Sequence, residues 1–182
     1  MSSMARRERE RAERHQLIIS TARRLAETEG WDAVTTRRLA DAIEYSQPVL
    51  YSHFDGKDAI LAAVALEGFA ELASAMGKAK DVTQLVRTYL GFAEDNPAVY
   101  DAMFTMNTRL QFAQEDTPEP LKAGFGAIQD VLAPVARGRD LGILTELAWS
   151  ALHGLATLTR SGRLPADGQR KRIAMLVDQL VA

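Results

Sequence analysis

Apolar residues recur at helical spacing along nearly the whole chain of 182 residues. In the stretch LIISTARRLAETEG, residues 17–30, apolar side chains return every three or four positions until a glycine ends the run. No segment alternates apolar and polar residues over the length of a β-strand. The sequence therefore predicts an all-α fold of about nine helices.

The composition is that of a chain with a hydrophobic core and no disulfides. Hydrophobic residues make up 47% of the sequence, the net charge is −2, and cysteine is absent, which excludes a disulfide framework and cysteine-ligated metal. The N-terminal residues are charged and do not resemble a secretory signal, and no apolar run approaches the ~20 residues that span a bilayer. We expect a soluble cytoplasmic protein with no membrane contact.

Residues 35–53 have the pattern of two short helices joined by a tight turn. We expect a first helix that is capped by the hydroxyl of Thr35 or Thr36 and has Leu39, Ala40 and Ile43 on its apolar face. A break at 44–46 and a second helix over 47–53 follow, with the Ser46 hydroxyl as the cap of the second helix. Pro48 falls in the first turn of the second helix, where its missing N–H would have had no partner. This is the helix-turn-helix geometry whose second helix enters the major groove of DNA.

The second helix carries polar and aromatic side chains where a buried helix carries aliphatic ones. Gln47 offers a donor and an acceptor to a base edge, and Pro48 or Val49 can touch a thymine methyl group. Residues 1–25 hold seven arginines and three acids, a net charge of +4, although residues 1–60 are neutral. This arm is therefore either a solvated helix face or a phosphate contact. The candidate DNA contacts are Arg6, Thr36, Arg37, Ser46, Gln47, Pro48, Val49, Tyr51, His53 and Lys57.

Other interpretations of the same residues stay open. Leu50 and Phe54 are expected to pack in the core, Tyr51 can be a half-buried packing residue, and His53 can bond locally. Helix-turn-helix geometry also occurs in proteins that never touch DNA. A helical adaptor that binds another protein through residues 44–60 is therefore the main alternative.

Residues 18–61 resemble the N-terminal region of the tetracycline-repressor (TetR) family of bacterial transcription regulators. The family usually has Gly and then Val in the turn where this chain has Glu44 and Tyr45. Because glycine tolerates a positive φ, Glu44 either is strained or alters the turn, and it places a negative charge near DNA. The matching pairs and runs are Gly30-Trp31, Thr35-Thr36, Leu39-Ala40, Leu50-Tyr51-Ser52-His53-Phe54 and Lys57-Asp58.

The resemblance implies a homodimer bound to double-stranded DNA. Its two reading helices would enter successive major grooves of a palindromic operator, ~34–36 Å apart. It also implies two domains, a helix-turn-helix DNA-binding domain at residues 1–56 and a ligand-binding and dimerisation domain at residues 57–182.

The C-terminal part resembles a TetR subgroup with a Trp-x-x-x-His-Gly signature, here Trp149, His153 and Gly154. The family fold implies that the last two helices, expected over 139–162 and 168–182, form the dimer interface. The side chains of these helices agree with such an interface, because they form stripes of small or apolar residues that another surface must bury. The candidates are Ala148, Ala151, Leu152, Leu155, Leu158, Ile173, Leu176, Val177 and Leu180.

A small, largely apolar effector is the expected ligand of the second domain, and no cofactor is expected. Tyr89 and Phe92 share one helix face, as Trp149 and His153 do, and such faces can line a pocket. Taken singly, each of these residues is more often an ordinary core residue. The candidates are Tyr89, Phe92, Tyr100, Met103, Phe104, Phe125, Trp149 and His153.

Two further function classes are weighed beside the adaptor. In the first, the effector releases a repressor from DNA by favouring a state whose reading helices no longer fit successive grooves. In the second, the chain is an enzyme with Asp101, Glu146 and His153 as conceivable acid or base groups, but it has no nucleophile motif, phosphate loop or metal spacing. The three histidines lie on separate segments, so no metal site is expected.

Overall fold

The computed structural model of the chain describes residues 3–108, 110–112 and 114–182. These residues form nine α-helices and no strand, which confirms the predicted all-α fold. Three single 3₁₀ turns, η1, η2 and η3, lie before α2, after α7 and before α9. The helices are α1 (Ser3–Glu29), α2 (Thr36–Ala42), α3 (Gln47–Tyr51), α4 (Lys57–Met76), α5 (Val82–Asp95), α6 (Pro97–Phe104), α7 (Glu119–Leu132), α8 (Leu141–Arg160) and α9 (Gln169–Val181).

Helix starts follow local side-chain chemistry. The Thr35 hydroxyl accepts from the N–H of Arg38, and the Asp81 and Asp140 carboxylates cap α5 and α8 in the same way. Pro48 lies in the first turn of α3, as the sequence predicts. Each of these bonds satisfies an N–H that the helix itself leaves unpaired.

Three predicted helix ends are wrong in detail. The second helix of the pair ends at Tyr51 instead of His53, and the Ser46 hydroxyl makes no capping bond. Thr117 followed by Pro118 also predicts a cap and first turn for α7, but the Thr117 hydroxyl accepts from the N–H of Gln114 and Pro118 takes the cap position. Helix ends depend on such competing local bonds, so they are set less firmly by sequence than the helices themselves.

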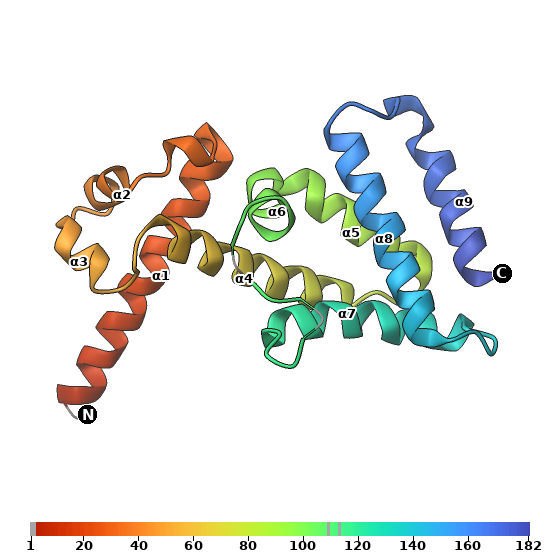
Figure 1. Ribbon diagram of the computed structural model, residues 1–182, viewed down its shortest axis with the longest axis horizontal. Helices are drawn as coiled ribbons and strands as arrows, with labels where there is room; N and C mark the ends of the chain where they lie inside the picture. Colours follow the sequence, from red (N-terminus) through yellow and green to blue (C-terminus); the bar gives the residue numbers. More distant parts are fainter. Residues whose placement is uncertain (1–2, 109, 113) are drawn as a thin grey trace. The chain divides into compact units, whose positions relative to one another are not determined.

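The described residues group into two compact units (Figure 1). We call the described residues of Met1–Gly68 and Pro97–Leu110 the first unit, and those of Phe69–Asn96 and Gln111–Ala182 the second unit. The first unit is larger than the predicted DNA-binding domain of residues 1–56. The division of function between residues 1–56 and 57–182 stays a prediction.

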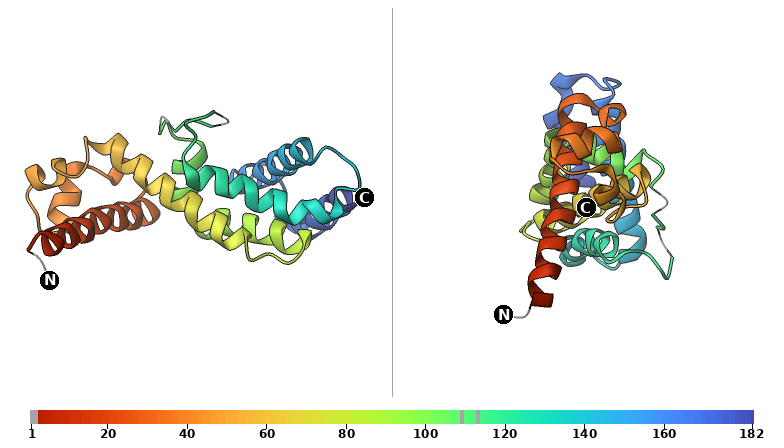
Figure 2. Two further views of the ribbon diagram at one scale, coloured as in Figure 1. Left: turned by 90° about the horizontal axis from the view of Figure 1, so that it is seen from below. Right: turned by 90° about the vertical axis from the view of Figure 1, so that its left-hand side faces the viewer.

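In the first unit, α1, α2 and α3 pack around a small aliphatic core. Ile18, Leu39, Leu50 and Ile60 are each 1% exposed or less. Figure 2 shows the long α1 with the two short helices on one side of it. Burial of these four side chains fixes which faces of α2 and α3 turn outward.

The first unit also holds α6, which follows α5 in the sequence. The Glu27 carboxylate of α1 accepts from the backbone N–H groups of Ala98 and Val99, at 3.1 and 3.0 Å. The Trp31 indole N–H donates to the Ala98 carbonyl at 2.8 Å. Two side chains from the N-terminal segment thus hold the first turn of α6, one of them acting as an anion at a helix N-terminus.

The second unit is a layer of helices in which α5 packs against α7, α8 and α9. Leu85, Val86 and Leu152 are completely buried at its centre. The Arg139 guanidinium donates to the carbonyls of Val135 and Leu180, both at 2.7 Å, and so ties the turn before α8 to the end of α9.

By length and composition, α4 and α8 are apolar enough to cross a membrane, contrary to the sequence expectation that no segment approaches this. Both helices bury apolar side chains, including Ile60 on the part of α4 that belongs to the first unit and Leu152 on α8 in the second. Core helices of folded proteins pass the same test of length and hydropathy.

Candidate nucleic-acid interface

The turn between α2 and α3 is built on a residue with a positive φ. Glu44 has φ +59°, its N–H donates to the Asp41 carbonyl at 3.3 Å, and the next N–H, of Tyr45, donates to the Ala40 carbonyl at 3.0 Å. This is the Schellman arrangement, which usually places glycine where Glu44 stands. Of the two outcomes left open for Glu44, the structure shows the strained conformation and an unaltered turn.

Helix α3 turns one face inward and a polar face outward. Leu50 is completely buried, and Val49 is half-buried. Ser46, Gln47 and Pro48 are exposed, and the Tyr51 side chain is 52% exposed. The structure therefore brings the predicted base-reading residues onto one outward surface.

The start of α2 contributes to the same surface. The Tyr51 hydroxyl lies 3.5 Å from the Thr36 hydroxyl, at the limit of a hydrogen bond. Arg37, the next residue, is exposed. Two hydroxyls, an arginine and the N-terminal N–H groups of α2 are the donor types that bind phosphate oxygens.

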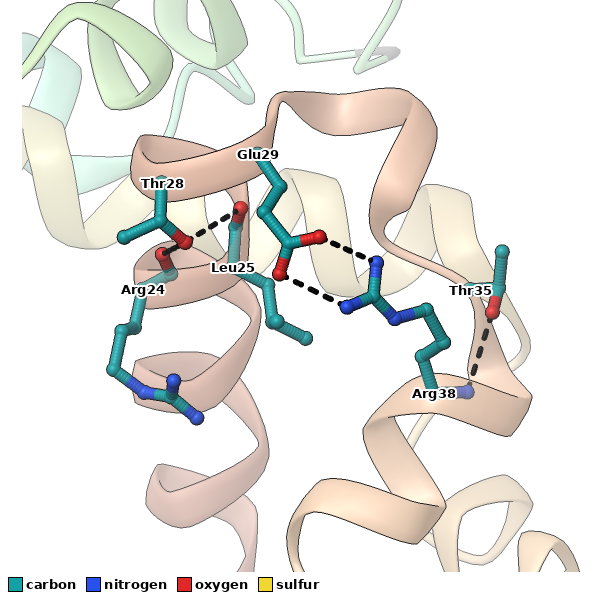
Figure 3. A network of polar contacts seen from close by, with 6 residues as sticks. All are labelled: Arg24, Leu25, Thr28, Glu29, Thr35 and Arg38. Carbon is teal, nitrogen blue, oxygen red and sulfur yellow. Dashed lines mark hydrogen bonds and ion pairs between the residues drawn. The ribbon is translucent and has the colours of Figure 1, made fainter.

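An ion pair fixes α2 against the end of α1 (Figure 3). The Arg38 guanidinium donates two bonds to the Glu29 carboxylate, both at 2.9 Å. The bonds from Arg38 lower the pKa of Glu29 below its ordinary value, and the same bonds raise the pKa of Arg38. Arg38 is thereby held on its own chain, and Arg37 is left as the outward cation of the first turn.

Two predicted phosphate contacts are engaged elsewhere in the first unit. The Lys57 ammonium donates to the Trp31 carbonyl at 2.6 Å and is half-buried. Arg6 forms an exposed pair with Glu10 one turn along α1, at 3.3 Å. Exposed pairs of this kind are weak and exchange with other partners, so Arg6 stays a predicted contact.

A pair of histidines, His15 and His53, meets beside Phe54. The imidazole of His15 stacks on the Phe54 ring with centroids 4.3 Å apart, and the His53 ring lies 6.0 Å from that of His15. Burial lowers the pKa of His53, and positive charge on His15, Arg11 and Arg14 lowers it further. No sequence pattern indicates this contact, because His15 lies on α1 and His53 lies in the turn after α3.

Metal binding finds no support in this pair. Two imidazoles without a further ligand do not make a closed metal site. Among the residues that the structure describes, no three His, Asp or Glu side chains are grouped to hold an ion.

The predicted effector-binding residues fall into both units. Tyr89, Phe92, Phe125, Trp149 and His153 belong to the second unit, and Tyr100, Met103 and Phe104 belong to the first. Tyr89, Tyr100 and Met103 are at most 1% exposed, while the other five are half-buried. A role for any of them in ligand binding stays a prediction.

An aromatic cluster of the second unit was only partly anticipated. The Phe112 ring lies 5.8 Å from Phe69 and 6.5 Å from Trp149, measured between centroids, and was not a candidate. One turn beyond Trp149 on α8, burial lowers the pKa of His153. A further turn along, the buried Thr157 hydroxyl has no hydrogen-bond partner in the described part of the chain.

The predicted dimer residues differ in how much surface they offer. Ala148, Leu152 and Leu180 are buried within the chain, whereas Leu158 is 38% exposed and Ala151, Leu155, Ile173, Leu176 and Val177 are half-buried. Larger exposed side chains on the same two helices were missed. They are Ile143, Leu147 and Met175, which are 53%, 63% and 64% exposed. The interface itself stays a prediction.

Comparison with known proteins gives matches along most of the chain. A family model described as bacterial regulatory proteins of the tetR family matches residues 18–64. A second model, described as a tetracyclin repressor-like C-terminal domain, matches residues 82–182.

Individual relatives are named as HTH-type transcription regulators. An uncharacterized HTH-type transcriptional regulator of Mycobacterium tuberculosis is 30% identical over 159 residues, which are 80% of this chain and 69% of that protein. The HTH-type transcriptional repressor AcnR of Corynebacterium glutamicum is 30% identical over 125 residues, which are 68% of this chain and 62% of that protein. The chain thus spans about two thirds of the length of each relative.

A solved structure shares the fold. The transcriptional regulator FadR of Bacillus subtilis, in complex with stearoyl-CoA, matches with a TM-score of 0.62 at 13% identity. The match covers 90% of this chain and 97% of that chain.

Proposed function

Since the chain belongs to the TetR family of bacterial regulatory proteins, which are DNA-binding transcriptional regulators, we propose that it is a repressor released from a palindromic operator by a small, largely apolar effector. The observation that carries the proposal is the outward face of α3. Exposed Gln47, Pro48 and Tyr51 stand on a helix that is held to the core by completely buried Leu50. Recognition of base edges in the major groove requires a helix that is fixed by packing and carries polar and aromatic side chains on its exposed face.

The proposed operator is palindromic because the protein is proposed to be a homodimer. Ile143, Leu147 and Leu158 recur at helical spacing along α8, and each is more than a third exposed. Met175 on α9 is exposed as well. An apolar stripe of this kind calls for a cover, and a second copy of the same stripe is self-complementary.

The proposed effector site lies in the second unit, among half-buried Phe92, Phe125, Trp149 and His153. Aromatic walls with one titratable group suit an apolar molecule with a polar end. The stearoyl-CoA bound to the Bacillus subtilis regulator is a ligand of that general character. We also propose membership of the Trp-x-x-x-His-Gly subgroup, on Trp149, His153 and Gly154, and a cytoplasmic location, where a bacterial operator is accessible.

Release requires that the effector prefer the state that cannot bind DNA. An effector that binds both states equally shifts nothing, however tightly it binds. No catalytic step is part of this mechanism, and the relatives are named as regulators.

The adaptor alternative keeps one observation in its favour. Residues 35–57 carry three basic residues and three acidic ones, a net charge of zero. A surface without net positive charge attracts DNA weakly. The two functions differ in salt dependence, because each phosphate contact releases counterions and protein recognition does not.

The test is selection from a randomised duplex library by the purified protein at two salt concentrations, with sequencing of the bound fraction. Enrichment of a palindrome that weakens with salt is the expected result. Gln47→Ala should flatten one position in each half-site, while Gln111→Ala, an exposed glutamine of the second unit, should leave the motif unchanged. No enrichment at either salt overturns the proposal and favours the adaptor.

A further inference from the structure

Glu44 combines two features that work against it. Its φ of +59° lies in the left-handed region, where a side chain is disfavoured and glycine is not. Its carboxylate also lies in the turn that leads into α3, and residues 44–48 are all exposed. An anion at this place is repelled by DNA phosphates.

The fold draws no visible support from the Glu44 side chain. In the described part of the chain, its carboxylate makes no hydrogen bond or ion pair, and the turn is held by the backbone bonds of Glu44 and Tyr45 alone. By contrast, the nearby Glu29 carboxylate is bonded twice to Arg38. A strained residue whose side chain forms no bond within the described residues is a reason to look for a function.

The base edges of the major groove differ in what they offer a carboxylate, which only accepts hydrogen bonds. Guanine and thymine present acceptors, which repel it. Adenine presents an amino group beside the N7 acceptor, and cytosine presents the N4 amino group without an N7 neighbour. Cytosine is therefore the base that a carboxylate at this turn favours.

We propose that Glu44 is a specificity-determining residue, which accepts a hydrogen bond from the N4 amino group of a cytosine in each half-site. This inference rests on the proposed function, since it requires that α3 enter the major groove. The carboxylate discriminates against the other bases by charge, and it lowers affinity for DNA in general. The strain at Glu44 is then kept for selectivity, which glycine at the same place would not supply.

The experiment compares three variants with the unchanged protein in the same library selection. Glu44→Gln keeps the length of the side chain and the strain but removes the charge, and Glu44→Gly removes both. Asp41→Asn removes an equal charge from an exposed, ordinarily helical position of α2. The expected result is a cytosine preference of about tenfold at one position per half-site. It should be lost in Glu44→Gly, weakened in Glu44→Gln because the amide oxygen still accepts a hydrogen bond, and kept in Asp41→Asn.

Affinity for an unrelated duplex at low salt should rise in both Glu44 variants, because a repulsive charge is gone. Unchanged preferences at every position in Glu44→Gln and Glu44→Gly overturn the inference while the proposed function stands. An unmutated protein that enriches no sequence overturns the proposed function, and the inference with it. A Glu44→Gly variant that unfolds at lower temperature than the unchanged protein also counts against the inference, because the side chain would then support the fold.

Discussion

Half-buried Glu27 is expected to stabilise the first unit. Its carboxylate accepts from two backbone N–H groups at the start of α6, and one of those donors belongs to Val99, which is 1% exposed. A hydrogen bond to a charged group contributes about 1.5–3 kcal/mol, and a buried donor left unpaired loses a similar amount. An anion at a helix N-terminus adds about 0.3–1 kcal/mol.

Glu27→Ala should therefore lower the free energy of unfolding by about 2–3 kcal/mol, because water can replace the carboxylate as hydrogen-bond acceptor for only part of the two backbone N–H groups. Glu27→Gln keeps an acceptor oxygen without the charge, and about half of that loss is expected. With a urea dependence of about 2 kcal/mol per molar, the midpoint of Glu27→Ala falls by about 1 M.

The assay can be confined to the first unit, because the chain has two tryptophans and each unit holds one. In a Trp149→Phe background, fluorescence reports Trp31, whose indole bonds to the same turn of α6. Glu13→Ala, at an exposed position of α1, is the matched control and should change the free energy by less than about 0.5 kcal/mol. Protein concentration is held fixed, since a dimer makes the midpoint depend on it. A Glu27→Ala midpoint equal to that of Glu13→Ala would refute the reasoning.

Three smaller perturbations follow from the same structure. A Cβ on Gly68 would overlap a Val99 methyl group, so Gly68→Ala should lower the free energy of unfolding in urea by about 1–3 kcal/mol. Gly124 lies on α7 with open space around it, so Gly124→Ala should raise that free energy by about 0.5–1 kcal/mol. Equal effects of the two substitutions would contradict this. Thr35→Ala removes the α2 cap and should lower the free energy of unfolding in urea by about 1 kcal/mol. No change would mean that the capping bond does not stabilise the fold. Burial lowers the pKa of His53, so as pH falls below about 6.5 this histidine is protonated in the unfolded chain before it is protonated in the folded one. The urea midpoint of unfolding should therefore fall in this pH range. In His53→Gln, the same fall in pH should lower the midpoint by a smaller amount.

The sequence was sufficient for several local features, although not for the Ser46 hydroxyl, which makes no capping bond. Thr35 as a cap and Pro48 in a first turn follow from neighbours within four residues, and the burial of Leu50 follows from helical periodicity. The resemblance to a family then supplied the division into two domains and the expected roles of the helices, which periodicity alone does not predict.

The same reasoning could not reach contacts between distant segments. Glu27 bonds to residues 71 and 72 positions away, and Lys57 bonds to the Trp31 carbonyl instead of pointing outward. No spacing rule predicts such a pair, since it depends on how helices cross after they form. Gln47, Pro48 and Tyr51 do lie exposed on α3, whereas Lys57 is bonded inside the first unit, and contact of these residues with DNA stays a prediction.

The position of α6 in the sequence bears on how an effector could act. Residues 97–110 belong to the first unit, yet both flanking segments, 69–96 and 111–182, belong to the second. The chain therefore connects the two units at both ends of α6 as well as through α4, and a rearrangement of the second unit acts on the first through these connections. If release requires α6 to leave α1, the effector must prefer the released state by at least the free energy that the Glu27 bonds contribute. Glu27→Ala would then be released at lower effector concentration. If α6 and α1 move together, the same variant loses stability and keeps its response to effector, so the two measurements in one variant distinguish the mechanisms.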